Sequence, residues 1–527
     1  MKELQQLKFE ELSVKQKIGM CMCASILNNE ESNEFTYDLI RNHSLGAVWI
    51  NTTVKNFEEC IKKIHEIADY PILIVRDSEG GSKYCYTGYH NPLAIADSEE
   101  LAYLFGKAVG VTARNQGYNV ICNPVVDLAN GNCECGLNVR SMGPDKKKVA
   151  RLAAAEVRGM HDAGVLAVAK HYPGLSQSPQ ADSHMAETFV PDSLEDVKDY
   201  NLYPYKYLME RDLLDGIMTG HCRFASVDND NPASLSRKAI GLIRELGFDG
   251  FAITDALSMM GVVAKYGLNE CKGLSIERGN DLALVWCDTR DAYAAMCECY
   301  DKGILTDKAL DEAAARVLRC QSRIIIEPKY TTFTEEEIKE SARLNTDTIY
   351  ARTDEGVPVA ISKEGKHFFA VLTEMDTDIS DAGKVDVATF EKRWYKPAIL
   401  MQKISEKFPN STVYAIHQFP TGSENSRILS KSLDYDDVIF VTFMGCEAYI
   451  GEERFTPRIL SLMRSMQVTN RISTVVHFGN PYVLEDVPHM PRILIGTTNH
   501  DNNLSAIEVL AGEREAKGTL VYDVKFR

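Results

Sequence analysis

"DKKKVARLAAAEVRGMHDAGVLAVAKHYPG", residues 145–174, joins a helical pattern to an apolar run within one short stretch. Residues 145–164 carry apolar side chains at spacings of three and four and end on Gly164, which is typical of an amphipathic helix. Residues 164–172 are apolar at successive positions, so we expect a strand that is buried on both faces. The stretch therefore predicts one helix–strand unit of a parallel sheet.

The same alternation of short apolar runs and longer amphipathic segments extends to about residue 325. A repeat count near eight over a segment of this length favours a (β/α)8 barrel over an open sheet. We assign residues 1–328 to this barrel domain. The expected strands lie in residues 18–25, 45–50, 71–77, 118–128, 164–172, 216–221, 250–257 and 281–286.

The second part of the chain has a different pattern. Residues 329–358 contain a Pro, a Thr-rich turn and one charged helical segment, and they predict a linker helix. Residues 359–527 predict a smaller C-terminal α/β sandwich domain. Neither part contains a GxGxxG or GxxxxGK[ST] loop, so the sequence does not support nucleotide binding. The strands of the second domain are expected in residues 367–372, 411–417, 437–443, 473–479 and 492–497.

Composition excludes several classes of partner. The 527 residues include 58 Lys and Arg against 75 Asp and Glu, a net charge of -17, which disfavours nucleic acids and anionic membranes as main partners. The N-terminus has no apolar core of signal-peptide length, and no later run is long enough to span a bilayer. The close pairs among the 14 Cys have one residue between their members, which suits neither a redox site nor a zinc site. We therefore expect a soluble, cytoplasmic protein with reduced thiols.

Ionisable residues stand at the ends of five expected barrel strands. In a (β/α)8 barrel the chemistry lies where strands end and loops begin, at the C-terminal face. Five such ends with ionisable groups indicate a pocket. These residues are Asp77, Asp127, Lys170 with His171, His221 and Asp255.

Asp255 ends the apolar run of "LGFDGFAITDALSMMG", residues 246–261. One interpretation is a helix N-cap, because an Asp before "ALSMM" would accept from free N–H groups. Another is a nucleophile, because a carboxylate held by backbone donors stays ionised. The two interpretations are compatible.

Asp182 and His184 lie two positions apart, after a segment rich in turn residues. In an extended segment both side chains would leave the same face, so the carboxylate could accept a hydrogen bond from the imidazole. Such a bond fixes the ring tautomer and favours the imidazolium, which could donate a proton and later take one back. The alternative is an exposed polar loop in which this spacing has no function.

Lys170 and His171 close a strand and precede Pro173-Gly174. A Lys at this position needs an acceptor if it is buried, and a sugar hydroxyl or a nearby carboxylate would serve. The alternative is a Lys at the rim whose ammonium group reaches water.

These blocks resemble glycoside hydrolase family 3, and most closely its bacterial β-N-acetylglucosaminidase branch, the NagZ-type enzymes. "KHYPG" is followed by "DSH", and other blocks occur in the family's order across most of residues 10–325. The ending "AIEVLAGEREAKGTLVYD", residues 506–523, is similar to the end of the family's C-terminal domain. The other blocks are "VRDSEGG" (75–81), "NPVVDL" (123–128), "NVRSMGPD" (138–145), "NPASLSRKAIGLIRELGFDGFAITDALSM" (231–259) and "ERGNDLALV" (277–285).

The resemblance implies a role for each matching residue. Asp255 matches the nucleophile, and His184 with Asp182 matches the acid/base dyad of this branch. The implied reaction is a double displacement with retention, on a small carbohydrate substrate and without a metal or organic cofactor. The residues implied to hold the sugar are Asp77, Arg140, Lys170 and His171.

Two segments differ from the family pattern. The usual basic residues after "EGG" are replaced in "SKYCYTGYH", residues 82–90, where Lys83 is the only nearby cation. The segment "LSQSPQADSH", residues 175–184, replaces a His-Gly-Asp run and is about one residue longer. Its Pro, Gly, Ser and Gln content predicts a loop flexible enough to bring the dyad over a bound sugar and to move away again.

The leading hypothesis is an exo-acting β-N-acetylhexosaminidase for small glycosides such as cell-wall recycling products or imported chitooligosaccharides. Three alternatives stay open. A neutral imidazole base repels an anion less than a carboxylate does, so phosphate could replace water and the enzyme would be a phosphorylase. A β-glucosidase or an arabinosidase/xylosidase of the same family is another alternative, although such relatives generally lack the D-x-H loop. The third is a barrel that binds sugar or a partner protein without catalysis.

Overall fold

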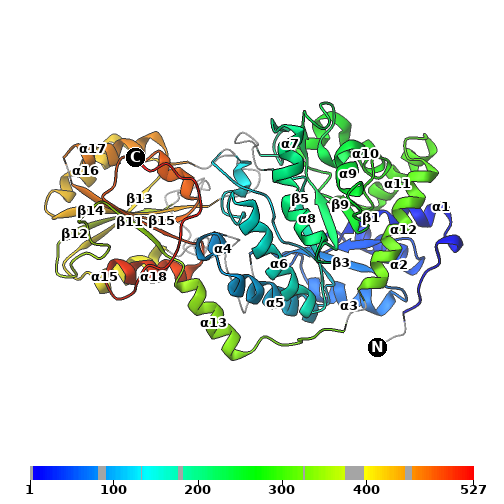
Figure 1. Ribbon diagram of the computed structural model, residues 1–527, viewed down its shortest axis with the longest axis horizontal. Helices are drawn as coiled ribbons and strands as arrows, with labels where there is room; N and C mark the ends of the chain where they lie inside the picture. The colour runs from blue at the N-terminus through cyan, green and yellow to red at the C-terminus, as the bar shows by residue number, and fades with distance from the viewer. Residues whose placement is uncertain are drawn as a thin grey trace.

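The computed structural model describes residues 4–80, 91–131, 133–175, 182–324, 327–373, 397–445, 454–469 and 471–527. The chain forms two lobes side by side (Figure 1). The chain up to residue 323 builds a parallel barrel with its helices, and most of the remainder builds a layered α/β lobe around a second sheet.

The barrel contains eight parallel strands in the order β10-β1-β2-β3-β4-β5-β7-β9. A parallel bridge between Ile253 and Leu282 joins the two ends of this sheet and closes it. The predicted (β/α)8 barrel is therefore confirmed. Its strands are β1 Met22–Ser25, β2 Ala47–Trp49, β3 Leu73–Asp77, β4 Val120–Cys122, β5 Leu166–Tyr172, β7 Gly216–Thr219, β9 Phe251–Thr254 and β10 Ala283–Val285; β6 Thr188–Val190 and β8 Cys222–Phe224 form a small separate sheet.

Helices surround the barrel. The expected first strand is shorter than predicted, because Ser13 and Gln16 form a capping box that starts a helix running to Met20. No helix in the described ranges has both the length and the apolar character needed to cross a membrane. The helices of this lobe are α1 Val14–Met20, α2 Glu30–Arg41, α3 Phe57–Ile67, α4 Asn91–Ala96, α5 Glu99–Asn115, α6 Lys146–Asp162, α7 Leu194–Asp196, α8 Tyr203–Met209, α9 Arg237–Arg244, α10 Met260–Glu277, α11 Thr289–Asp301 and α12 Asp307–Arg323.

Helices α5 and α6 pack with their backbones in close contact. A Cβ atom added to Gly106 would lie 1.9 Å from the carbonyl oxygen of Glu156, and one added to Gly159 would lie 2.3 Å from that of Tyr103. Glycine at both positions therefore permits this crossing. Helix α6 begins after Asp145, whose carboxylate accepts from the N–H groups of Lys147 and Lys148. The predicted helix of residues 145–164 is confirmed.

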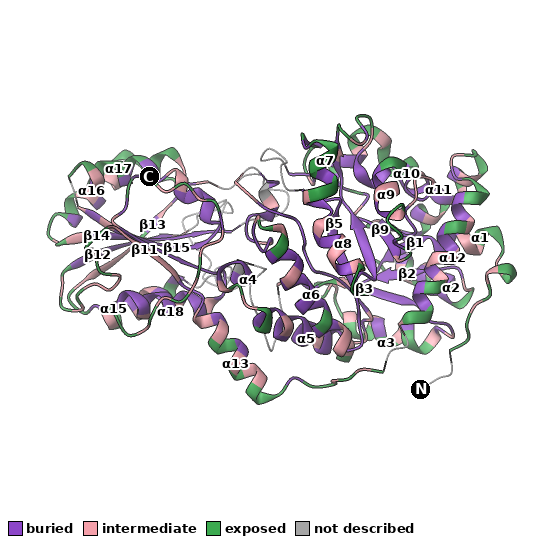
Figure 2. Cartoon of the chain, in the orientation of Figure 1, coloured by how far each residue is buried: buried purple, intermediate pink, exposed green. Residues whose placement is uncertain are grey.

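Figure 2 shows that most strands of both lobes are buried, whereas the edge strands of the second sheet, β11 Tyr350–Thr353 and β13 Thr412–His417, are partly exposed. Alternate residues of the barrel strands, such as Leu73, Val75 and Ile253, fill the barrel interior. The residues between them pack outward against the helices. This filling of the interior leaves the strand ends as the places where polar side chains can gather.

The second lobe is a six-stranded sheet in the order β11-β16-β15-β14-β12-β13. Residues 350–353 lie in the expected linker, but they form the edge strand β11, which is antiparallel to β16. Helix α13, Glu335–Thr346, occupies the expected linker helix. The other elements are β11 Tyr350–Thr353, β12 His367–Thr373, β13 Thr412–His417, β14 Asp437–Met444, β15 Ile472–Gly479, β16 Arg492–Gly496, α15 Pro397–Lys407, α16 Gly422–Ser432, α17 Pro457–Val468 and α18 His500–Leu510.

The two lobes contact each other through α4, where the Thr519 N–H donates to the Ile95 carbonyl oxygen at 2.9 Å, and through the loop that follows β4. Tyr482 directs its hydroxyl group to the carbonyl oxygen of Ala129 at 3.5 Å, and Tyr522 donates to that of Ser141 at 3.4 Å. The two tyrosine rings pack edge to face with centroids 5.7 Å apart. The second lobe therefore supports residues 129–141 of the barrel lobe.

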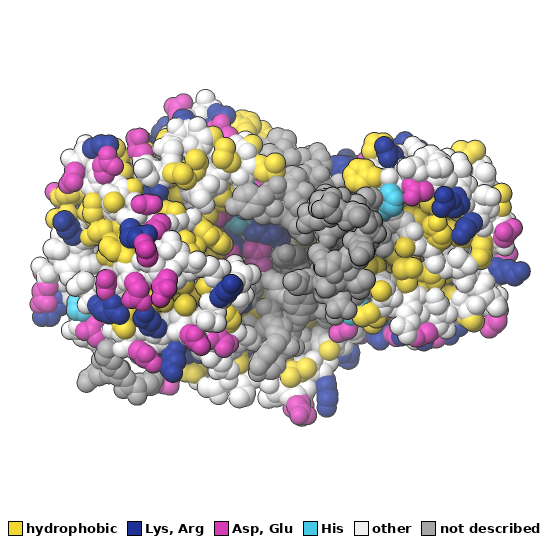
Figure 3. All heavy atoms as spheres, turned by 180° about the vertical axis from the view of Figure 1, so that it is seen from behind, with side chains coloured by type: hydrophobic (Ala, Val, Ile, Leu, Met, Phe, Trp, Pro, Cys, Tyr) yellow, Lys and Arg dark blue, Asp and Glu magenta, His cyan; other side chains and the backbone are white. Residues whose placement is uncertain are grey.

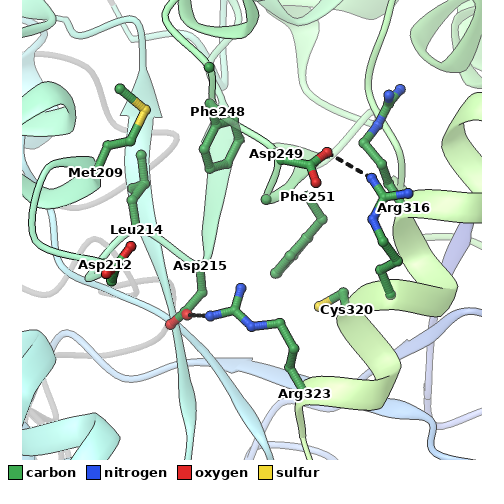
Figure 4. A pocket seen from close by; sticks show the side chains of 13 residues that line it. Met209, Asp212, Leu214, Asp215, Phe248, Asp249, Phe251, Arg316, Cys320 and Arg323 are labelled. Atoms are coloured by element: carbon green, nitrogen blue, oxygen red, sulfur yellow. Dashed lines mark hydrogen bonds and ion pairs between the residues drawn. The ribbon is translucent and has the colours of Figure 1, made fainter.

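At the N-terminal end of the barrel, buried and exposed ion pairs line one pocket (Figure 4). Asp215 is buried and accepts from Arg323 Nη2 at 2.6 Å, His161 Nε2 at 2.6 Å and the Ala167 N–H at 2.9 Å. Asp249 lines the same pocket and pairs with Arg319 at 2.7 Å, but both of these side chains are exposed.

The two aspartates provide a matched test of what burial adds to an ion pair. We expect Asp215→Ala to lower the free energy of unfolding by about 3–5 kcal/mol, because it leaves the buried Ala167 N–H and the partly buried His161 ring without an acceptor and removes the partner of Arg323. We expect Asp249→Ala to lower it by less than about 1 kcal/mol. Urea denaturation measures both values. Equal losses for the two variants would contradict this account of the barrel end.

Candidate active site

Lys170 and His171, at the end of β5, both reach the mouth of the barrel. The pairing of β5 with β7 shifts register between Lys170 and Tyr172, which breaks the alternation that would send consecutive side chains to opposite faces. Lys170 is only 2% exposed, and its Nζ lies 2.5 Å from Asp77 Oδ1 and 2.5 Å from Glu79 Oε1. Lys170 is therefore a buried, paired cation, and the alternative of a Lys at the rim is wrong.

Glu79 receives a second cation from Arg140. Arg140 Nε and Nη2 donate to its two carboxylate oxygens at 2.7 and 2.9 Å, in a bidentate pair. Burial opposes ionisation of Glu79, but Arg140 and Lys170 outweigh it and hold the pKa of this carboxyl group well below its ordinary value. Arg140 and Lys170 are thus fixed by Glu79, whereas the carboxylate of Asp77 is about half exposed.

His171 lies between a buried carboxylate and Asp255. Its Nδ1 lies 2.7 Å from Asp127 Oδ2, which also accepts the His171 backbone N–H at 2.9 Å. Arg140 Nη2 lies 3.2 Å from His171 Nε2, and an arginine can only donate, so Nε2 accepts in this contact. The same Nε2 is 4.0 Å from Asp255 Oδ2. Asp127 therefore fixes the ring that faces Asp255.

Asp255 follows β9 directly, at the barrel mouth. It does not cap a helix: α10 begins at Met260 after Met259, so the N-cap interpretation is wrong. The Ala256 N–H donates to Asp255 Oδ1 at 2.7 Å. Burial opposes ionisation, but the neighbouring imidazole rings of His171 and His221, together with this N–H bond, leave the pKa of Asp255 below its ordinary value. The side chain is an ionised carboxylate at neutral pH.

His221 lies at the end of β7 and is fully buried. Its Nε2 donates to the carbonyl oxygen of Ala256 at 3.0 Å, and its Nδ1 lies 2.8 Å from Ser234 Oγ. Burial lowers the pKa of His221, so the ring is neutral at pH 7. His221 thus supports the backbone next to Asp255 and does not act there as a cation.

Asp182 and His184 meet in a turn. Asp182 Oδ1 lies 2.7 Å from His184 Nδ1 and accepts the His184 backbone N–H at 2.9 Å. The predicted contact is present, but its predicted origin in an extended segment is wrong, because residues 182–186 form a turn closed by bonds to the Asp182 carbonyl oxygen. Asp182 and Ser183 are buried, His184 is partly exposed and residues 185–187 are exposed, so the turn is buried on the side of Asp182.

The turn lies against the start of α10, a few residues after Asp255. The Met260 N–H donates to the His184 carbonyl oxygen at 3.3 Å, and the Gly261 N–H donates to that of Ser183 at 3.0 Å. His184 is close enough to Asp255 to contribute to the low pKa of that carboxyl group. The structure therefore brings the residues predicted for catalysis together at one end of the barrel.

Figure 3 shows the opposite side of the molecule from Figure 1, with a recess near its middle where His, basic and acidic side chains are visible. Two segments predicted to influence the sugar pocket, residues 81–90 with Lys83 and residues 176–181, lie outside the described residues. The predicted flexibility of the second segment therefore stays a prediction.

Two carboxylates of the site were missed by the sequence analysis. Glu79 lies two residues after Asp77 within the quoted "DSEGG" block, and this spacing could have revealed it. Glu134 gave no such signal, because it lies in the irregular loop after β4. Glu134, Asp182 and His184 each place a potential metal-ligand atom within 4.8 Å of the others.

Comparison with known families gives the identity of the barrel lobe. Residues 2–320 match the model of the glycosyl hydrolase family 3 N-terminal domain, which is more than half of the chain. The chain belongs to glycosyl hydrolase family 3. This confirms the family resemblance of the barrel blocks.

Curated relatives of this family 3 chain match its barrel lobe. "Beta-hexosaminidase LpqI" of Mycobacterium bovis (strain BCG / Pasteur 1173P2) is 32% identical over 218 residues, which are 40% of this chain and 55% of that protein. The chain thus spans about half the length of that relative. "Beta-hexosaminidase" of Tolumonas auensis is 31% identical over 248 residues, 45% of this chain and 73% of that protein.

Solved structures share the two-lobed family 3 fold over almost the whole chain. A glycoside hydrolase family 3 beta-N-acetylglucosaminidase from Paenibacillus sp. str. FPU-7 has a TM-score of 0.79 and 24% identity, covering 98% of this chain and 100% of that one. "Beta-glucoside phosphorylase BglX" has a TM-score of 0.79 and 21% identity, covering 98% and 94%. At these identities the likeness shows the fold.

The buried ion pairs of the family 3 site predict a substitution whose cost in unfolding free energy depends on pH. Pairing lowers the pKa of Glu79 in the folded state, so its stabilisation is present above the unfolded-state value of about 4.3 and declines as the pH falls below it. We expect Lys170→Met to lower the free energy of unfolding by about 3–5 kcal/mol at pH 7 and by less at pH 4, measured by urea denaturation.

Lys63→Met is the control, because Lys63 pairs with Glu34 at an exposed position. The free energy of unfolding of Lys63→Met should fall by less than about 1 kcal/mol at both pH values. If Lys170→Met lost the same stability at both pH values, the contribution of the ionised carboxylates would be refuted.

Proposed function

We propose that the protein is a retaining exo-β-N-acetylhexosaminidase that removes terminal GlcNAc from small glycosides. The observation that carries the proposal is the seating of the Asp182–His184 pair on α10, close to the ionised carboxylate of Asp255. A carboxylate and an oriented imidazole are the two groups that a double displacement requires. The names of the curated relatives support the choice of sugar.

In the proposed first step, a carboxylate oxygen of Asp255 attacks the anomeric carbon, and the bond from that carbon to the leaving oxygen breaks. His184 Nε2 donates its proton to the leaving oxygen, while Asp182 accepts from Nδ1 and fixes the ring. In the second step His184 takes a proton from water, and the oxygen of that water replaces Asp255 at the anomeric carbon. The configuration of the sugar is retained overall.

The remaining site residues are proposed to hold the sugar. Asp77 has an exposed carboxylate beside Lys170 and can accept from sugar hydroxyl groups. Arg140 and His171 lie between Glu79 and Asp255, so they face the ring at the reacting carbon. Lys170 acts mainly by holding Asp77 and Glu79, because its ammonium group contacts both.

Two variants with azide test the assigned roles. Asp255→Ala should lower kcat/KM on p-nitrophenyl β-GlcNAc by at least about 1,000-fold, and added azide should then give the α-glycosyl azide, because the small anion takes the place of the nucleophile. His184→Ala should leave the glycosyl-enzyme intact, so azide should attack it and give the β-glycosyl azide. NMR of the products measures the anomeric configuration.

The control for these variants is Asp249→Ala at the opposite end of the barrel, which should keep wild-type turnover. His184→Ala should lose about 100- to 10,000-fold on substrates with poor leaving groups and much less on 2,4-dinitrophenyl β-GlcNAc. The same azide anomer from both variants would contradict the assignment. Equal rates on p-nitrophenyl β-GlcNAc and β-Glc would contradict the proposed sugar.

Phosphorolysis is a second candidate, favoured by the imidazole at the acid/base position, which adds no negative charge of its own. Turnover with and without phosphate, with detection of sugar-1-phosphate, separates the two reactions. The carboxylates of Asp182 and Glu134 beside His184 favour water, because they repel an incoming anion. We therefore propose hydrolysis as the main reaction.

We propose that the enzyme works in the cytoplasm on cell-wall recycling products or imported chitooligosaccharides. Eleven cysteines in the described part of the chain carry free thiols, which suits a reducing compartment. Immunodetection in fractionated cells tests the location. Recovery of the protein outside the cytoplasm would reject this part of the proposal.

A further inference from the structure

Ser183, between the two members of the dyad, is held from two sides. Its N–H and its hydroxyl group both donate to Glu134 Oε1, at 2.7 and 2.6 Å. On the other side its carbonyl oxygen accepts the Gly261 N–H at 3.0 Å. All three backbone and side-chain polar groups of Ser183 are therefore used, and the residues before and after it are Asp182 and His184.

Glu134 is a buried hydrogen-bond acceptor. It is 4% exposed, and burial raises the pKa of this carboxyl group, while the two bonds from Ser183 oppose that effect. His171 and Arg140 also oppose the effect of burial on this pKa. A buried carboxylate that accepts two short hydrogen bonds on one oxygen ties the turn to the loop after β4.

The opposite contact leaves little space for the turn to move. A Cβ atom on residue 261 would lie 3.0 Å from the Ser183 carbonyl oxygen and 3.2 Å from Cβ of His221. Glycine at this position therefore lets the turn approach α10 closely. Glu134 and Gly261 together fix Ser183 along the line between the β4 loop and α10.

We propose that Glu134 is the positioning residue of the Asp182–His184 dyad, acting through Ser183. The inference rests on the proposed function and extends it, because nothing in the family resemblance assigned Glu134 a role. By fixing the residue between Asp182 and His184, Glu134 sets where the imidazole lies relative to Asp255. A displacement of about 1 Å in such a group reduces the rate by about 100-fold.

A metal ion is the rival explanation for this cluster, since Glu134, Asp182 and His184 offer ligand atoms within 4.8 Å of one another. The bonds in the structure favour positioning. Glu134 Oε1 accepts two hydrogen bonds from Ser183, and Asp182 Oδ1 accepts two from His184. One carboxylate oxygen of Glu134 and one of Asp182 are thus occupied by protein donors.

The test compares Glu134→Ala, Glu134→Gln and Ser183→Ala with Glu187→Ala as the control. Glu187 is three residues after His184, but its exposed carboxylate pairs with Arg223. We expect Glu134→Ala to lower kcat/KM by about 10- to 100-fold on GlcNAc substrates with poor leaving groups and by less than about 3-fold on 2,4-dinitrophenyl β-GlcNAc, because the latter needs little acid catalysis.

The related variants should follow the number of hydrogen bonds that they keep. Glu134→Gln retains an acceptor oxygen and should lose less than Glu134→Ala, and Ser183→Ala retains the N–H donor and should also be intermediate. Glu187→Ala should match the wild type on every substrate. Thermal unfolding checks that each variant is folded. A loss in Glu134→Ala that is equal for good and poor leaving groups would overturn the inference.

A second measurement does not depend on turnover. Hydrogen exchange of residues 182–186 should be faster in Glu134→Ala than in the wild type and unchanged in Glu187→Ala, because the Ser183 N–H loses its acceptor. This measurement does not depend on the proposed glycosidase activity. Unchanged exchange in Glu134→Ala would overturn the positioning role whatever the outcome of the activity assays. EDTA treatment of the wild type should have no effect; if it reproduced the Glu134→Ala loss, a metal site would replace the inference.

Discussion

The barrel mouth depends on one constraint, which is that a buried charge needs a partner of opposite sign. Lys170 is buried, so it requires Asp77 and Glu79, and Glu79 in turn accepts both donors of Arg140. Arg140 reaches His171, which is held by Asp127. This continuous series of contacts joins β3, the loop after β4 and β5 into one polar surface beside Asp255. Its members, in order, are Asp77, Lys170, Glu79, Arg140, His171 and Asp127.

The barrel could be predicted from the sequence because the same pattern, a short apolar run followed by an amphipathic segment, recurs along the chain. Each strand is a short run that is apolar at successive positions, and each expected run contains a strand of the observed sheet. Boundaries were less predictable, since they depend on local competition. Residues 18–20 are apolar enough for a strand, but the capping box of Ser13 and Gln16 extends a helix through them. Likewise β11 depends on pairing with the distant β16, which no local pattern records.

The site could be predicted where chemistry coincides with a strand end or a family block. Both a strand end and a family block pointed to Asp255, Lys170 and His171. Only a family block pointed to Asp182 and His184. What the residues contact could not be predicted, because it depends on folding of distant loops. Glu134 is 49 residues from Ser183, in a loop without periodicity, and only the folded chain brings them together.

The contact between the lobes adds a consequence for how the protein can be divided. Tyr482 and Tyr522 of the second lobe touch the loop of residues 129–141, and this loop carries both Glu134 and Arg140. The second lobe therefore supports, from its outer side, a loop that contributes two residues to the proposed site. A barrel cut from this chain would keep the residues proposed for catalysis and lose the support of the loop that carries Glu134 and Arg140, so the unit proposed to catalyse is larger than the barrel itself.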